Sequence, residues 1–134
     1  MIVVDAESAI LGRLASKIAK ELLKGEEIIV INSEKSIVSG NPEAIFERFL
    51  AKIHRGDPHK GPFYPKQPDR IFRRVVRGML PYKKQRGSQA FKKLKVFMAN
   101  PKNLQGEKIS KTAAEMESKY LTLAQISKKM GWKQ

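Results

Sequence analysis

The feature that most constrains the fold is an unbroken apolar run, IIVI, from Ile28 to Ile31. Four residues are too few for an independent helix, and β-branched side chains without polar alternation are typical of a strand buried on both faces. A shorter apolar run, Ile2 to Val4, predicts a second strand. Because parallel strands need a crossover connection, the segment between the two runs decides how they pair.

That segment is predicted to be the crossover helix. Apolar residues repeat at helical spacing from Ala9 to Leu23, and Gly25 is well placed to end the helix. Ile37 and Val38 favour a further short strand. Asn41 is a candidate N-cap for a second helix, from Pro42 to about Ile53. Strands that alternate with helices predict an α/β fold with a parallel sheet.

The next segment, His54 to Gln67, has no apolar period and contains three prolines and two glycines. This composition predicts an extended surface loop, and a loop of this length is usually functional or disordered. The whole chain, 134 residues, fits a single domain. We divide it into an α/β core, 1–101, that includes the loop 54–67, and a C-terminal extension, 102–134.

Further elements are predicted after the loop. A helix should run from about Asp69 to Met79, where Pro81 stops it. Ser88 is a candidate cap for a short helix that also takes in Leu94, and Val96 to Met98 favours a strand that enters the sheet.

The C-terminal extension is polar and is expected to wind over the surface. Near its end, Thr122 and Gln125 have the spacing of a capping box for a helix from Leu123 to Met130, and Gly131 would stop that helix.

Charge is concentrated in one region of this basic chain. The whole sequence has 27 Lys or Arg against 13 Asp or Glu, a formal charge of +14. Between Lys52 and Lys95, 14 basic residues face only Asp57 and Asp69, a net charge of +12. Self-repulsion of this size is usually relieved by a polyanion, and the candidates are RNA, DNA and an anionic membrane. Five of the ten aromatic residues lie in the same region and are candidates to stack on bases, although Phe72 and Phe91 have core spacing.

The stretch from Arg70 to Gly87 contains seven Lys or Arg and no acid. On a helix, four of its arginines form one stripe at i, i+3, i+4 and i+7, and apolar residues fall on the opposite side. Guanidinium groups suit phosphate oxygens, and four of them on one stripe repel each other without an anion. The stripe is formed by Arg70, Arg73, Arg74 and Arg77, and the apolar side by Ile71, Phe72, Val75, Val76 and Met79.

Other functions find less support in the sequence. A solvated surface helix is the plain alternative, and membrane binding is disfavoured because the apolar side lacks tryptophan and is needed for a core. The absence of cysteine excludes disulfides, thiolate metal sites and cysteine nucleophiles. His54 and His59 flank Asp57, but two rings and one carboxylate among cations make a poor metal site. We expect a cytosolic protein that is not an enzyme and has no cofactor, metal or small-molecule substrate.

Several short motifs are spread along the chain. They are LGRLAS at 11–16, INSEKSIVSG at 31–40, VRGMLP at 76–81, KKQRG at 83–87 and LKVF at 94–97, with YLTL at 120–123 and GW at 131–132 near the C-terminus. Together these motifs resemble the family of large-subunit ribosomal proteins numbered thirteen, in its archaeal and eukaryotic branch. One departure is Asn100, since a glycine is expected just before Pro101.

The resemblance implies a three-layer α/β/α domain with a small, mainly parallel four-stranded sheet. It also implies a scaffold in the large ribosomal subunit, in the cytoplasm, which binds ribosomal RNA, lies against neighbouring ribosomal proteins and supports subunit assembly. A DNA-binding or chromosomal architectural protein is the alternative on charge alone.

Charge, helical face and the resemblance together predict the RNA-binding residues. They are Arg55, His59, Lys60, Lys66, Arg70, Arg73, Arg74, Arg77, Lys83, Lys84, Arg86, Lys92 and Lys93. Gly78 and Gly87 have two open interpretations: they let the backbone approach RNA closely, or they serve turns and packing.

Overall fold

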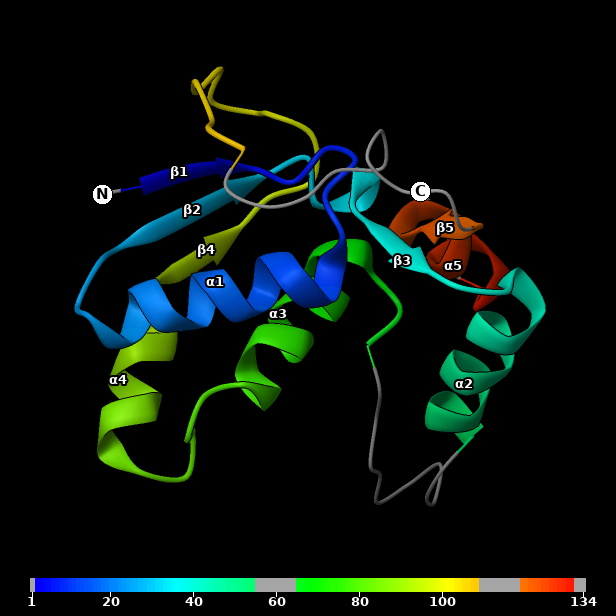
Figure 1. Cartoon of the computed structure of the whole chain (residues 1–134), viewed down its shortest axis with the longest axis horizontal. Coiled ribbons are helices and arrows are strands. Elements are labelled where there is room, and N and C mark those ends of the chain that lie inside the picture. The colour runs from blue at the N-terminus through cyan, green and yellow to red at the C-terminus, as the bar shows by residue number, and fades with distance from the viewer. Residues whose placement is uncertain (1, 55–64, 109–118, 132–134) are drawn as a thin grey trace.

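The computed structural model describes residues 2–54, 65–108 and 119–131. Its helices and strands follow the alternation expected from the sequence (Figure 1). In chain order they are β1 (Ile2–Asp5), α1 (Leu11–Leu23), β2 (Ile28–Ile31), the short 3-10 helix η1 (Ser33–Lys35), β3 (Ile37–Ser39), α2 (Pro42–His54), α3 (Pro68–Gly78), α4 (Gln85–Lys92), β4 (Leu94–Val96), β5 (Tyr120–Thr122) and α5 (Leu123–Lys129).

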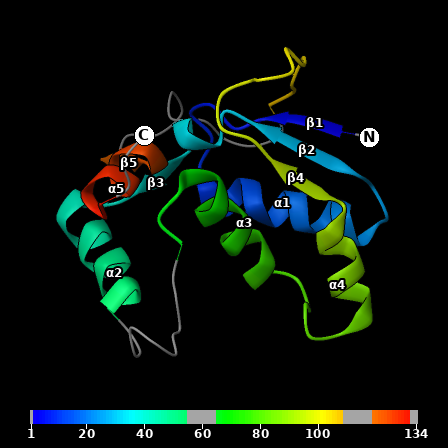
Figure 2. The ribbon, with the colours of Figure 1, turned by 180° about the vertical axis from the view of Figure 1, so that it is seen from behind.

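A parallel sheet with the strand order β1-β2-β4 forms the centre of the fold. Ile2 pairs with Ile28, and Ile28 pairs with Leu94 on its other side. All four residues of β2 are buried, which confirms the prediction of a strand covered on both faces. Figures 1 and 2 show α1, α3 and α4 together on one side of this sheet, and α1 is the predicted crossover helix.

The predicted four-stranded sheet is not found among the described residues. β3 leaves the parallel sheet and pairs with β5 in antiparallel, Ile37 opposite Thr122. The reason lies at Asn32, which follows β2 directly and has a left-handed backbone with φ of 57°, so that the chain turns away. At the β1 edge of the parallel sheet, Glu107 forms a single parallel bridge to Val4.

The expected three-layer arrangement is likewise not confirmed. Ile28 and Val30 share one buried cluster with residues of α1 and α3. On the other face of β2, Ile31 is covered by the segment after β4, because a Cβ on Gly106 would lie 3.1 Å from its Cδ1 atom. Within the described residues, an extended segment and not a helix covers that face at Ile31.

Local capping signals were predicted correctly. The Asn41 side chain accepts a hydrogen bond from the Glu43 amide at 3.0 Å where α2 begins. Thr122 and Gln125 form the capping box of α5, with reciprocal bonds of 3.2 and 3.0 Å. Gly25, just after α1, and Gly131, just after α5, have the left-handed φ values of +96° and +99° that end a helix without strain.

Other boundaries were predicted wrongly. Ser88 does not cap α4; it lies inside that helix, which begins after Lys84, and the Ser88 amide donates to the Lys84 carbonyl. The strand expected at Val96 to Met98 lies two residues earlier, at Leu94–Val96, because the backbone of Leu94 pairs with Ile28. β5 was not predicted. Asn100 stands where the family resemblance predicts a glycine before Pro101. Its side chain makes two hydrogen bonds to the backbone of Leu104, at 2.7 and 2.9 Å, and these bonds close the turn.

The C-terminal segment contributes to the core and does not only wind over the surface. Leu123 and Ile126 of α5 are fully buried and belong to the same cluster as Phe49 of α2 and Phe72 of α3. Figure 1 shows α5 and β5 beside β3, with α2 next to them. α3 therefore has packed neighbours along its apolar side, and its orientation is fixed.

Candidate nucleic-acid interface

Helix α3 is amphipathic as predicted. Pro68 is its first residue, and Ile71, Phe72 and Val76 are completely buried. The apolar side packs against α1 and also contacts α5 and β4. Met79, expected on that apolar side, is exposed, because the helix ends at Gly78 and the chain turns away there.

The four arginines of the predicted stripe are not equivalent. Arg70 is exposed, whereas Arg73, Arg74 and Arg77 are half-buried. The guanidinium of Arg73 donates a hydrogen bond of 2.9 Å to the carbonyl oxygen of Leu94 and lies over the ring of Phe91, 4.7 Å from its centre. These contacts tie α3 to α4 and to the start of β4, so Arg73 has a structural role that its charge alone does not reveal.

Arg77 makes a different contact, with the turn that follows α3. Its guanidinium carbon lies 4.3 Å from the centre of the Tyr82 ring, and Tyr82 is exposed. As a hydrogen-bond donor and as a positive charge, Arg77 lowers the pKa of the Tyr82 phenol from its ordinary value of 10.0, and the charges of Lys83 and Arg74 act in the same direction. Positive potential is therefore high around this ring.

The turn between α3 and α4 is held by the backbone. The Tyr82 amide bonds to the Leu80 carbonyl and the Lys84 amide to the Pro81 carbonyl, at 2.8 and 2.9 Å. Gly87 is buried against this turn, where a Cβ atom would overlap the Pro81 carbonyl group. Gly78 is exposed, and a Cβ there would meet nothing within 4 Å. The packing interpretation therefore holds for Gly87, while Gly78 has open space beside it.

Helix α4 continues the basic surface toward the end of α1. A hollow of about 460 Å³ is lined by residues of α4 and of the end of α1. Lys93 and Gly25 both line it, and the Nζ atom of Lys93 donates a hydrogen bond of 3.2 Å to the Gly25 carbonyl. Its other lining residues are Leu22, Leu23, Gln85, Arg86, Gln89 and Ala90. Gln85 and Gln89 were not among the predicted site residues; their i, i+4 spacing on either side of Arg86 was the available signal.

Most of the predicted RNA-binding residues are accessible. Those exposed are Lys66, Arg70, Lys83, Lys84, Arg86, Lys92 and Lys93. Figure 2 shows α3, the turn and α4 following one another on the side of the molecule away from the sheet. Arg55, His59 and Lys60 lie outside the described residues, as do the side chain of His54 and the whole of Asp57.

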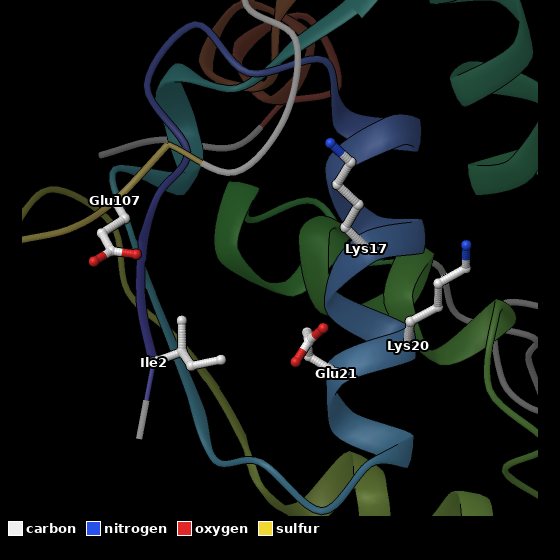
Figure 3. Close-up of a pocket in the computed structure, with 5 residues that line it drawn as sticks. All are labelled: Ile2, Lys17, Lys20, Glu21 and Glu107. Carbon is white, nitrogen blue, oxygen red and sulfur yellow. The ribbon is translucent and has the colours of Figure 1, made fainter.

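A second hollow, of about 330 Å³, lies between β1 and α1 and has a different character (Figure 3). It is lined by Lys17, Lys20, Glu21 and Glu107 around the apolar side chain of Ile2. Because its charges are mixed, it does not extend the basic surface. Within residues 2–54, 65–108 and 119–131, no three His, Asp or Glu side chains are placed to bind a metal ion. None of the helices described combines the length and apolarity needed to span a bilayer.

Comparison with known proteins decides the family. The family described as Ribosomal protein L13 matches residues 1–103. The chain belongs to this family. Proteins named large ribosomal subunit protein uL13 are 50% identical to it in both Methanopyrus kandleri and Archaeoglobus fulgidus, over 97% and 98% of this chain and 86% and 88% of those proteins. The relative of that name in Haloarcula marismortui is 42% identical, over 97% of this chain and 90% of its own length.

These relatives confirm the predicted family and its archaeal branch. Although the family match ends at residue 103, the archaeal uL13 proteins align with nearly the whole chain, so the C-terminal segment that contains β5 and α5 lies within the similarity. The name that they carry is that of a ribosomal protein and not of an enzyme, in agreement with the prediction.

Proposed function

We propose that this protein is a structural constituent of the large ribosomal subunit, binds ribosomal RNA and supports assembly of the subunit in the cytoplasm. The observation that carries the proposal is the outward basic surface of α3, the turn and α4, on a chain whose relatives are named large ribosomal subunit proteins. Its partners are ribosomal RNA and neighbouring ribosomal proteins.

The basic side chains have different roles in binding RNA. The exposed side chains of Arg70, Lys83, Lys84 and Arg86 contact phosphates directly, together with Lys92, Lys93 and Lys66. Arg74 and Arg77, half-buried, contribute positive potential close to the helix surface. Arg73 also contributes charge, but its bond to the Leu94 carbonyl makes it chiefly a positioning residue for the junction of α3, α4 and β4. Arg55, His59 and Lys60 of the loop 54–67 extend the contact along the RNA.

Phosphates are the main ligand of this surface. Helical RNA presents a regular phosphate array and a wide, shallow minor groove, so recognition rests chiefly on shape. Neutralising about eight phosphates gives a slope of roughly −6 to −7 for log K against log salt concentration. The buried side of α3 keeps the cations in register, because Ile71, Phe72 and Val76 cannot leave the core without large loss of stability.

Sedimentation of cell extract tests the proposal. We expect the tagged chain to migrate with the large ribosomal subunit and to stay with it through a high-salt wash. Migration with chromosomal DNA, or preference for duplex DNA over structured RNA in competition at fixed salt, would instead support a DNA-binding architectural protein.

A further inference from the structure

Two large apolar side chains are exposed within the basic surface. Met79 and Tyr82, on the turn between α3 and α4, are 43% and 39% exposed. Among the described residues the other large apolar side chain of this kind is Tyr120, 45% exposed, on β5. A surface that bound only phosphates would need cations but no apolar ring, so the position of Tyr82 calls for a ligand with an aromatic or apolar part.

The turn that carries the Tyr82 ring is held in place before any ligand binds. Leu80 anchors the turn in the core, and the Tyr82 amide donates to the Leu80 carbonyl at 2.8 Å. Gly87 of α4 packs against Pro81 and lies close to the Tyr82 amide nitrogen, so the turn cannot shift toward α4. A ligand that meets this ring therefore does not have to order the turn, which lowers the entropic cost of binding.

The charges around the ring select the ligand. The Arg77 guanidinium covers part of Tyr82 at 4.3 Å, and Lys83, Lys84 and Arg86 follow in sequence with exposed side chains. A protein partner would have to bury several cations next to the ring. A nucleotide satisfies both features at once, because its base stacks on an aromatic face while the flanking phosphates meet the lysines and arginines.

We propose that Tyr82, backed by Arg77, is a stacking site for one unpaired base of the bound RNA, with Met79 at its edge. This inference rests on the proposed RNA-binding function and adds to it a contact with a base, where that function requires only phosphates. It also assigns different tasks to neighbouring residues: Tyr82 binds the base, and Lys83 and Lys84 bind the phosphates on either side of it.

The test compares two ligands and three variants of the full chain. One ligand is a single-stranded hexaribonucleotide that carries one 2-aminopurine, and the other has the same backbone without bases. The variants are Tyr82→Leu, Tyr82→Phe and, as a matched control on a similarly exposed ring outside the basic surface, Tyr120→Leu. Thermal unfolding of each variant checks that its fold is intact.

We expect Tyr82→Leu to weaken binding of the base-containing oligonucleotide about 5- to 150-fold, the range for loss of one base–aromatic stack. Tyr82→Phe and Tyr120→Leu should bind within about twofold of the parent chain, since the first keeps the ring. Binding to the parent chain should quench the 2-aminopurine fluorescence, and Tyr82→Leu should lose this quenching. Affinity for the oligonucleotide without bases should be the same in all variants.

Three results would overturn the inference. Unchanged binding of the base-containing oligonucleotide by Tyr82→Leu would show that the ring meets no base. An equal loss for both oligonucleotides would assign the effect to charge or to the turn. Failure of the parent chain to bind the base-containing oligonucleotide at 50 mM salt, while it still binds a transcript of large-subunit ribosomal RNA, would overturn the stacking site alone; failure to bind the transcript as well would contradict the RNA function itself.

Discussion

Substitution of Gly87 tests the packing of the turn against α4. The residue is buried and has no left-handed backbone, so its importance comes from space and not from φ. A methyl group there would overlap the carbonyl group of Pro81 and lie 2.9 Å from the Tyr82 amide nitrogen. Both neighbours are backbone atoms, which cannot swing aside as a side chain would. We therefore expect Gly87→Ala to push α4 away from the turn.

The expected loss of stability in Gly87→Ala is the difference between two opposing effects. Because the overlap is with backbone atoms, overpacking should cost about 2–3 kcal/mol, the upper part of the usual range, and the higher helix propensity of alanine offsets about 1 kcal/mol of it. The net decrease in the free energy of unfolding should be about 1–2 kcal/mol, or a urea midpoint lower by about 0.5–1 M. Urea unfolding followed by far-ultraviolet circular dichroism measures this loss.

Gly78→Ala is the matched control, in the last turn of α3. A Cβ at Gly78 meets nothing within 4 Å, so alanine should leave stability unchanged or raise it by up to about 1 kcal/mol. If RNA approaches the backbone at Gly78, the same variant will bind RNA less tightly without loss of stability. A Gly87→Ala variant as stable as Gly78→Ala would show that α4 is not packed tightly against the turn.

Three further predictions concern single side chains. Arg73→Gln should lower the free energy of unfolding by about 1–3 kcal/mol, because it loses the bond to the Leu94 carbonyl and the contact with Phe91. Arg70→Gln should leave urea unfolding unchanged and should reduce the salt slope of RNA binding by about 1. Thr122→Ala should cost about 0.5–2 kcal/mol in the same unfolding assay, because it removes the cap of α5; no loss would mean that the capping box contributes nothing. The phenol of Tyr82 should lose its proton below pH 10. This titration is followed by the increase in absorbance at 295 nm that is missing in Tyr82→Phe, and Arg77→Gln should raise the pH at its midpoint. Since the pKa of Tyr82 is lower in the folded state than in the unfolded state, its contribution to stability is fully present above pH 10 and is lost as pH falls through the folded-state pKa. A titration midpoint that does not change in Arg77→Gln would show that Arg77 does not lower the pKa of Tyr82.

Elements that depend on neighbouring residues could be predicted from the sequence. The IIVI run of β2, the Asn41 cap and the capping box of α5 depend on periodicity or on bonds within three residues, and each lies where it was expected. The apolar side of α3 followed from helical period alone, apart from Met79 at its end. The archaeal L13 family was recognised because its motifs extend along nearly the whole chain.

Features that depend on distant contacts could not be predicted. β3 pairs with β5, which is about 80 residues away in sequence, and no local pattern encodes that partner. Leu94 has apolar spacing that suits both a helix and a strand, and its pairing with Ile28 decides between them. The bond from Arg73 to the Leu94 carbonyl spans 21 residues, so a stripe of four similar arginines proved to contain side chains with different roles.

The salt dependence of RNA binding shows how many phosphates the basic surface neutralises. The measurement is the affinity of the full chain for a transcript of large-subunit ribosomal RNA between 50 and 400 mM salt. A surface that neutralises about eight phosphates predicts a slope of roughly −6 to −7 for log K against log salt concentration. A slope shallower than about −2 would contradict the claim that phosphates are the main ligand of α3, the turn and α4.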